Sequence, residues 1–309
     1  MFNKMIKPME PLLCKEVFDS SDYIYQLKWD GVRMLTYINK NQVKLINKRQ
    51  HLRTEQYPEL MLLPKLFKGH NSIIDGEIVV VRNGKPSFPA VIRRDRCQTK
   101  STINHLKESL PIDYMVFDLV FLNDRDLTGL PFSERKEILS QVFSFDKGIH
   151  LVDDFTQGTL LYSAVKSQEL EGIIAKKKTS PYIEGKKHKA WFKIKYRHQQ
   201  LCVIGGFTKS NKQINSLLLG VYQAGNLYYV GKVGSGLTGT EWETLSIKLP
   251  ELKSNSSPFY NLKYNKPDYF YIKPVLPVLI EFAEWTDNMH LRSPVIKHFV
   301  NIDPQECYV

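Results

Sequence analysis

The segment KWDGVR, residues Lys28–Arg33, follows directly on a β-rich run of the chain. Lys28 and Asp30 are two residues apart, and this spacing places both side chains on one face of a strand. Gly31 allows a sharp turn after them, so that Arg33 presents its planar guanidinium fork beside the same face. The segment therefore predicts a charged face on a strand in an otherwise apolar region.

Two further apolar strand candidates carry ionisable residues at the same spacing, namely Asp75 with Glu77 and Lys193 with Lys195. Each pair alone is more readily the solvated face of an edge strand. If the three strands share one sheet, however, their charged faces line a cleft where unpaired burial is costly. A nucleoside triphosphate with a divalent metal satisfies such a cleft: lysines hold phosphate oxygens, and carboxylates such as Glu77 and Glu171 hold the metal.

Lys28 is the candidate nucleophile. A lysine amine is normally protonated, with a pKa near ~10.4, and it reacts only when its surroundings lower that pKa. Burial and neighbouring cations or a metal ion have this effect. Lys28 lies beside the predicted cationic cluster and meets the condition.

The first two thirds of the chain alternate short β-rich runs with helical stretches. We expect strands near residues 23–28, 42–46, 72–80 and 114–121, and helices over residues 57–66 and 131–143, the latter with Ser133 as its N-cap. No GxGxxG or GxxxxGK[ST] phosphate loop occurs. The pattern predicts an α+β domain over residues 1–195.

After Lys195 the pattern changes to short strands punctuated by glycine, near residues 203–207, 217–222 and 227–233, with further strands from about Val275. Such strands are typical of a small barrel. The polar stretch 196–200 is expected to act as a hinge before a second domain over residues 196–309. A length of 309 residues fits two domains, because single cores stop growing near ~250–300 residues.

Lysine and arginine exceed aspartate and glutamate by 43 to 32, a formal charge of +11 that favours a polyanionic partner. Composition alone does not separate nucleic acid from anionic lipid or free nucleotide. No apolar run approaches the ~18 residues of a membrane span, and the N-terminus lacks the apolar core of a signal peptide, so we expect a cytoplasmic protein without a membrane partner. The cysteines stand singly, which indicates neither a zinc site nor a disulfide framework.

The segment Lys28–Arg33 resembles KxDGxR, the first signature of the covalent nucleotidyltransferases, which include DNA ligases, some RNA ligases and mRNA capping enzymes. The other signatures follow in family order. Ile74–Val79 is similar to the third motif, Phe117–Leu119 to the adenine-stacking segment, Glu171–Lys176 to the fourth motif and Trp191–Lys195 to the fifth. Their joint occurrence is far more specific than any single match.

Among these families the chain most resembles the ligase module of bacterial end-joining DNA ligases, through Ser180–Tyr182, Gly185–Lys187, Val203–Phe207, Tyr229–Gly236, Glu281–Thr286 and Leu291–Pro294. The resemblance implies a nucleotidyltransferase (adenylation) domain over residues 1–195, followed by a small β-barrel OB-fold domain over residues 196–309.

Carried over by position, the resemblance makes Lys28 the catalytic residue that becomes adenylated. It implies a nucleotide site formed by Gln26, Leu27, Lys28, Arg33, Lys48, Arg49, Glu77, Phe117, Lys193 and Lys195. Phe117 would stack on adenine, Arg33 and Glu77 would lie near the ribose, and the last two lysines would hold the α-phosphate. The metal would be bound by Asp30, Glu77 and Glu171, and DNA by Lys176, Lys186, Lys187, Lys232 and Arg292.

Some of these residues also have a simpler interpretation. Phe117 lies in an apolar strand and could belong to the core, and Glu171 precedes a glycine and could be a turn carboxylate. The lysines of residues 176–178 and 186–189 could be solvated surface charge, although a phosphate track suits them.

The function implied is that of an ATP-dependent DNA ligase, which seals 5′-phosphate/3′-hydroxyl nicks in duplex DNA through a lysyl-AMP intermediate. DNA repair such as end joining, and DNA recombination, are the processes implied. The cofactors would be ATP and Mg²⁺ or Mn²⁺. The partners would be nicked duplex DNA and a Ku-like end-binding protein, and the enzyme would be a monomer.

Three departures from the family pattern leave alternatives open. Gln26 stands where a glutamate usually precedes the nucleophile, either Lys48 or Arg49 fills the arginine motif, and residues 297–304 lack the basic ending that helps expel pyrophosphate. The alternatives are a capping-type RNA guanylyltransferase and a catalytically weak DNA-end-binding module.

Overall fold

A computed structural model describes residues 4–144, 148–211, 213–262 and 268–309. The chain divides into two units, Met1–Tyr196 and Arg197–Val309. In the described part of the chain, no helix is long and apolar enough to cross a membrane.

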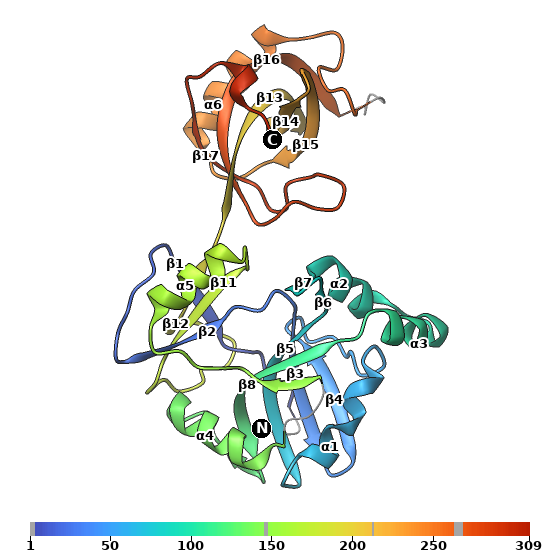
Figure 1. The fold of residues 1–309 in the computed structure, drawn as a ribbon, viewed down its shortest axis with the longest axis vertical. Coiled ribbons are helices and arrows are strands. Elements are labelled where there is room, and N and C mark those ends of the chain that lie inside the picture. Colours follow the sequence, from blue (N-terminus) through green and yellow to red (C-terminus); the bar gives the residue numbers. More distant parts are fainter. Residues whose placement is uncertain (1–3, 145–147, 212, 263–267) are drawn as a thin grey trace. The chain divides into compact units, whose positions relative to one another are not determined.

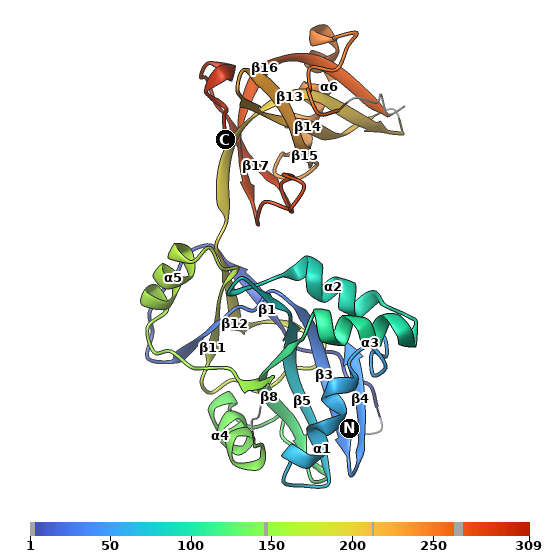
Figure 2. The same cartoon turned by 45° about the vertical axis from the view of Figure 1, so that its right-hand side comes forward.

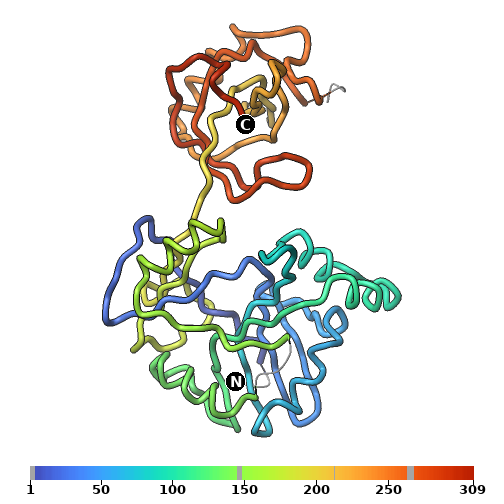
Figure 3. The backbone as a smooth tube through the Cα atoms, viewed as in Figure 1, coloured from blue at the N-terminus to red at the C-terminus, as the bar shows by residue number. Residues whose placement is uncertain are grey.

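The first unit contains a four-stranded sheet in the order β1-β12-β11-β2. These strands are β1 (Glu10–Cys14), β12 (Lys187–Lys195), β11 (Gly172–Lys177) and β2 (Tyr23–Leu27). β1 pairs with β12 in parallel, and the other pairs are antiparallel. The tube trace shows how this sheet brings the N-terminal strand β1 beside β12, which lies more than 170 residues further on (Figure 3).

A second sheet in the same unit has the order β10-β8-β5-β3-β4, with β9 added to β8. Its strands are β3 (Val32–Asn39), β4 (Gln42–Asn47), β5 (Asn71–Val79), β8 (Asp113–Leu122), β9 (Arg125–Asp126) and β10 (Ile149–Leu151). A short ribbon of β6 (Val81–Arg82) and β7 (Lys85–Pro86) follows β5.

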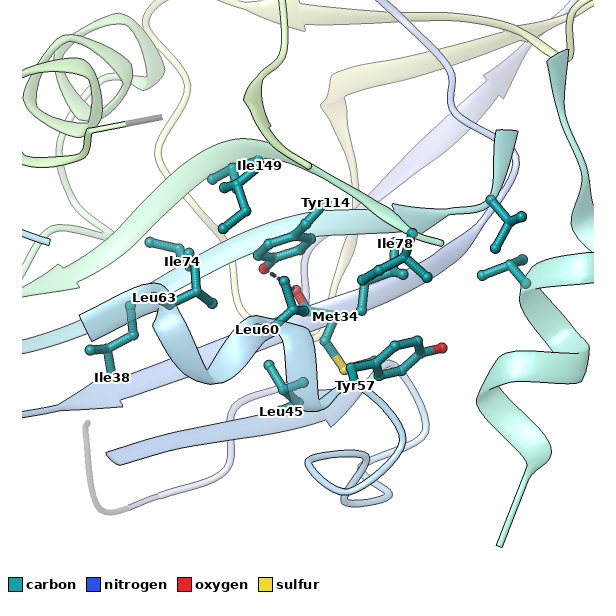
Figure 4. Packing of buried hydrophobic residues seen from close by; sticks show 14 of the residues in the cluster. Met34, Ile38, Leu45, Tyr57, Leu60, Leu63, Ile74, Ile78, Tyr114 and Ile149 are labelled. Carbon is teal, nitrogen blue, oxygen red and sulfur yellow. Dashed lines mark hydrogen bonds between the residues drawn. The ribbon is translucent and has the colours of Figure 1, made fainter. Parts of the chain in front are cut away.

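Alternation along these strands separates an apolar face from a polar one. Met34 of β3, Ile74 and Ile78 of β5 and Tyr114 of β8 point into a buried cluster, where Leu60 packs on them (Figure 4). The Tyr114 hydroxyl donates to the Met34 carbonyl at 3.0 Å, which satisfies it inside the core. The intervening residues of the same strands therefore face the other way, toward the first sheet.

Helices cover the outer faces of both sheets (Figures 1 and 2). The second sheet carries η1 (Pro58–Leu62), α1 (Leu63–Leu66), α2 (Phe88–Arg96) and α3 (Lys100–Ser109). α4 (Phe132–Val142) packs on β8, and α5 (Gly158–Ser167) packs on β11 and β2 of the first sheet. The inner faces meet through an apolar cluster that includes Leu35, Tyr182 and Trp191.

The second unit is a curled antiparallel sheet in the order β15-β14-β13-β16-β17. The strands are β13 (His198–Ser210), β14 (Gln213–Gln223), β15 (Asn226–Val233), β16 (Tyr269–Phe282) and β17 (Val295–Phe299). Backbone bonds from Leu291 to Val230 and from Ile296 to Ser235 bring the two edges of the sheet together. α6 (Gly239–Lys248), η2 (Leu249–Leu252) and η3 (Pro304–Glu306) complete the unit, and α6 begins with a capping box of Thr238 and Glu241.

Several local predictions are wrong in detail. The N-cap of α4 is Pro131, and Ser133 lies inside the helix, where its amide donates to the Lys178 carbonyl. The stretch 57–66 forms a 3-10 turn and one short α-helix. The boundary between the two units falls at Tyr196, inside the stretch expected to act as a hinge, although β13 already begins at His198.

Candidate active site

A cavity of about 610 Å³ lies in the first unit. It receives Gln26 and Leu27 from β2, Arg33 from β3, Glu77 from β5, Phe117 from β8 and Lys193 from β12. Lys28, Lys48 and Arg49 line it as well. The structure thus brings together nine of the ten residues predicted to bind nucleotide, and the tenth, Lys195, contacts the same centre through Glu171.

Lys28 is held by a carboxylate that it shares with a second lysine. Its Nζ donates to Glu171 Oε2 at 2.5 Å, and Lys195 Nζ donates to Glu171 Oε1 at 2.7 Å. Burial by itself would raise the pKa of Glu171, but the charges of Lys28 and Lys195 outweigh it and lower that pKa. Glu171 is therefore an ionised partner of Lys28 and not a turn carboxylate.

Two glycines make this geometry possible. Gly172 has φ +147°, and a Cβ there would lie 2.2 Å from the Ile194 carbonyl, so only glycine allows Glu171 to approach the end of β12. A Cβ on Gly31 would lie 2.2 Å from the Ile78 carbonyl. Gly31 thus permits close approach to β5, and the sharp turn predicted for it is not its main role.

Lys28 and Asp30 do not share a strand face, because β2 ends at Leu27. The Lys28 amide instead donates to the Gly172 carbonyl at 3.0 Å, which anchors the residue just past the strand. Asp30 is not one of the residues that line the cavity in the described part of the chain. The prediction for this pair was wrong because the strand is one residue shorter than the apolar pattern indicates.

Arg33 is committed to a carboxylate that is completely buried. Its Nε and Nη2 donate to the two oxygens of Asp75 at 3.0 and 2.6 Å, and the Tyr182 hydroxyl donates to Asp75 at 2.6 Å. Burial opposes the charge of Arg33, but Asp75 raises the pKa of the guanidinium. The guanidinium group expected near the ribose therefore binds Asp75, while the Arg33 side chain still lines the cavity.

Glu77 projects into the cavity beside these charges. Burial raises its pKa to about 8, against the opposing influence of Lys28 and Arg33. The carboxyl group of Glu77 is consequently mostly protonated at neutral pH, because its burial outweighs the charges of Lys28 and Arg33.

Lys176 does not belong to the DNA-binding surface predicted for it, because its side chain is buried. It is 2% exposed, and its Nζ lies 4.1 Å from the ring centre of Phe117 and 4.4 Å from that of Trp191. Burial lowers its pKa to about 7. Pairing of Lys176 with Trp191 across β11 and β12 turns it inward, so it cannot follow a phosphate backbone on the surface.

A network that the sequence did not reveal lies behind Gln26. The Gln26 Nε2 donates to Asp154 Oδ1 at 2.7 Å, and Lys136 Nζ donates to the same oxygen and to the Val152 carbonyl. Burial lowers the pKa of Lys136, and Asp154 opposes that effect. Gln26 and Asp154 are 128 residues apart, so no local spacing could have linked them.

The remaining DNA-binding candidates lie on surfaces. Lys186, Lys187 and Lys232 are exposed, the last on β15. Arg292 lies 2.9 Å from Glu284 in an ion pair. Lys297, in the tail that departs from the family pattern, pairs with Glu281 at 3.0 Å.

The donor set suits a divalent cation only together with a ligand. Within the described residues, no three His, Cys, Asp or Glu side chains form a metal-binding group. Mg²⁺ commonly uses one or two carboxylates and completes its shell with substrate phosphates and water. Glu77, whose pKa is raised by burial, and Glu171 fit that arrangement.

Comparison with known proteins matches both parts of the chain. Residues 4–195 match the family model described as ATP dependent DNA ligase domain, and residues 210–300 match the ATP dependent DNA ligase C terminal region. DNA ligase C of Mycobacterium tuberculosis (strain ATCC 25618 / H37Rv) is 32% identical over 244 residues, which are 75% of this chain and 67% of that protein.

The multifunctional non-homologous end joining DNA repair protein LigD of the same strain is 30% identical over 285 residues. The match covers 89% of this chain but 35% of that protein, so the chain spans about a third of the length of this relative. Among solved structures, mycobacterial DNA ligase D complexed with ATP and MES has a TM-score of 0.57 and 27% identity, with 98% of this chain and 97% of that chain covered.

Proposed function

Since the chain belongs to the ATP-dependent DNA ligase family, we propose that it seals nicks in duplex DNA and carries AMP on Lys28 during the reaction. One observation carries the assignment of Lys28. Its amine lies at the cavity beside a second cation, Lys195, with which it shares Glu171, and a neighbouring cation is one of the conditions that activate a lysine nucleophile.

In the first transfer, the Lys28 amine attacks the α-phosphorus of ATP, a phosphorus–nitrogen bond forms and pyrophosphate leaves. In the second, a 5′-phosphate oxygen of the nick attacks the same phosphorus and Lys28 leaves as a free amine. In the third, the 3′-hydroxyl attacks the 5′-phosphorus, the strand is closed and AMP departs. Each step is an in-line displacement, so the protein contributes mainly positioning and neutralisation of charge.

The residues of the cavity divide this work between them. Lys193 and Lys195 on β12 face the phosphate end, where their charges stabilise the five-coordinate transition state. Burial and the charges of Lys195 and Lys28 lower the pKa of Lys193, which shows how crowded the cations are before an anion arrives. Phe117 offers its ring to the base.

Glu77 and Glu171 would hold a divalent cation, Mg²⁺ or Mn²⁺, with Asp30 as a further contributor. When bound, the cation supplies charge neutralisation at the α-phosphate and favours loss of the Lys28 proton. Lys28 must also leave Glu171 before it can attack, because its Nζ is engaged by that carboxylate.

For DNA, we propose contacts from Lys186, Lys187, Lys232 and Arg292, with the adenylation domain ending at Lys195 and the OB-fold domain following it. The enzyme would act as a monomer in the cytoplasm, in DNA repair such as end joining, together with a Ku-like end-binding protein. The similarity to LigD supports this setting.

The test is transfer of AMP to the protein, followed by sealing. Incubation with ATP and Mg²⁺ should add one AMP, located on Lys28 by peptide mass spectrometry. Lys28→Ala should abolish the adduct yet still seal a nick that is already adenylated at its 5′ end, and Lys28→Arg should behave alike because guanidinium stays protonated. Lys44→Ala, which alters an exposed lysine on β4, is the control.

Three outcomes would contradict the proposal. AMP on another residue would remove Lys28 from its role. Labelling by GTP in place of ATP would favour the capping-type alternative. Binding of DNA ends without any adduct or sealing would favour the catalytically weak DNA-end-binding module.

A further inference from the structure

Gln26 is anchored by a network outside the reacting centre. It lines the cavity from β2 and is only 2% exposed, and its Nε2 donates to Asp154 at 2.7 Å. Asp154 lies between β10 and α5, where Lys136 donates to the same carboxylate oxygen. Lys136 is itself held by the Val152 carbonyl. The anchor therefore belongs to the second sheet and its helix α4, while Gln26 belongs to the first sheet.

The chemistry of this anchor sets the orientation of the Gln26 amide. A carboxylate only accepts hydrogen bonds, so the NH₂ group of Gln26 must face Asp154. The side-chain oxygen then points away from Asp154, and it accepts no hydrogen bond from any residue that the structure describes. An occupant of the cavity removes this oxygen from solvent, and an acceptor left without a donor is then costly, so an occupant with an N–H group is favoured here.

A second polar atom nearby is unpaired and of the opposite kind. Lys176 Nζ, a donor, has no hydrogen-bond partner in the described part of the chain and lies 4.1 Å from the ring centre of Phe117. On paired strands, Gln26 is opposite Ile174 and Ile24 is opposite Lys176, so Gln26 and Lys176 are diagonal neighbours. An acceptor and a donor beside an aromatic ring match the edge of a purine with a 6-amino group.

We propose that Asp154, held by Lys136, is a positioning residue that orients the Gln26 amide and thereby selects a 6-amino purine over a 6-oxo purine. Adenine presents a donor at C6, which the Gln26 oxygen accepts, whereas a 6-oxo purine presents an acceptor there. Two acceptors would then face each other in a buried site, which loses the hydrogen bond and leaves both atoms unsatisfied. The inference rests on the proposed function, because it concerns the nucleotide donor of the first transfer.

The wild-type protein offers a first test that needs no variant. The kcat/KM for nucleotide transfer to the protein is measured with ATP, with purine riboside triphosphate, which lacks a 6-substituent, and with ITP, which differs from ATP at C6. We expect ATP to be best, purine riboside triphosphate to be intermediate because it lacks only the donor, and ITP to be worst. Equal use of ATP and ITP would overturn the proposal.

Asp154→Ala removes the anchor, so that the Gln26 amide can turn its NH₂ group toward the cavity. We expect the preference for ATP over ITP to fall by about tenfold or more, mainly through KM. Gln26→Met should lose the preference as well, and adding Asp154→Ala to it should have no further effect, because Asp154 acts only through Gln26. Asp153→Ala, which removes a neighbouring exposed carboxylate, is the matched control and should keep the wild-type ratio.

The outcomes distinguish a failure of this inference from a failure of the proposed ligase function on which it rests. An unchanged ATP/ITP ratio in Asp154→Ala, or an additive double variant, overturns the positioning role while the ligase assignment stands. Absence of any AMP adduct in the wild type refutes the proposed function instead. A circular dichroism spectrum and a urea-unfolding midpoint close to those of the wild type, measured for each variant, show that the fold is intact.

Discussion

Replacing Lys176 with methionine should stabilise the folded protein, most strongly below pH 7. Lys176 is 2% exposed, its Nζ has no hydrogen-bond partner among the described residues, and burial lowers its pKa to about 7. Methionine has a similar length and packs well against aromatic rings. The variant therefore removes a buried charge and leaves the contacts with Phe117 and Trp191 in apolar form.

The sign and size follow from the two pKa values. Below pH 7 both folded and unfolded chains hold the proton, and the whole cost of burying the charge applies. Between pH 7 and 10.5, the ordinary pKa of a lysine, the unfolded chain holds more protons, so the stability of the wild type rises with pH. A shift of this size corresponds to roughly 5 kcal/mol at most, and cation–π contacts of roughly 0.5–2 kcal/mol offset part of it. We expect the stabilising effect to be about 2–3 kcal/mol larger at pH 6 than at pH 10.

Urea unfolding of both proteins at a series of pH values measures this effect. The difference between variant and wild type at each pH cancels the contributions of other titrating groups. Lys186→Met, which replaces an exposed lysine in the same segment of the chain, is the control and should show no such trend. A difference that stays constant from pH 6 to pH 10, or a variant less stable at pH 6, would refute the reasoning.

Three other predictions concern ligands. Phe117→Ala should raise the ATP concentration needed for self-adenylation more than it slows sealing of adenylated nicks, because stacking of ~1–3 kcal/mol per base is lost. Phe117→Tyr should have only a small effect on that ATP concentration. An unchanged ATP affinity in Phe117→Ala would mean that Phe117 is a core residue and does not stack on the base. Binding of Mg²⁺ with a non-reactive ATP analogue at pH 7 should release about one proton from Glu77, whose pKa is about 8; calorimetry in buffers of different ionisation enthalpy measures this release. Glu77→Gln should abolish the release. An identical proton count in that variant would contradict the role of Glu77. The affinity for a nicked duplex should fall steeply as the salt concentration rises. A chain ending at Lys195 should bind the nick much less tightly and with a shallower salt dependence. Equal binding and sealing by residues 1–195 would show that the second domain takes no part in the DNA site.

The residues at the centre of the site were predictable from the sequence because the pattern that identifies them spans only a few consecutive residues. Glu77, Lys193 and Lys195 interrupt apolar strands at a spacing of two, and the strands do form with those residues on inward faces. Alternation is a property of a few consecutive residues, so it survives without knowledge of the tertiary fold. The same reasoning located β2, β4, β5 and β8 of the first unit and β13, β14 and β15 of the second, but not β1, β3, β10 or β11.

The burial of Lys176 and the hydrogen bond between Gln26 and Asp154 could not be predicted from the sequence. Lys176 begins a run of three lysines that looks like solvated charge, yet its position on β11 directs it between two sheets. Asp154 lies in a loop whose sequence carries no signal for its contact with Gln26. Strand order decides both cases, and strand order is set by contacts between residues far apart in the chain.

The ion pairs of Glu171 explain how the folded protein can hold two neighbouring lysine charges and still bind a triphosphate. Glu171 gives one oxygen to Lys28 and the other to Lys195, so neither cation is buried unpaired. A triphosphate can replace the carboxylate on each lysine without raising the number of unpaired charges. Glu171 would then be free to help hold a divalent cation, and Lys28 would lose its hydrogen bond to Glu171. We therefore propose that an exchange of ion-pair partners, and not the creation of new charges, prepares Lys28 for the attack.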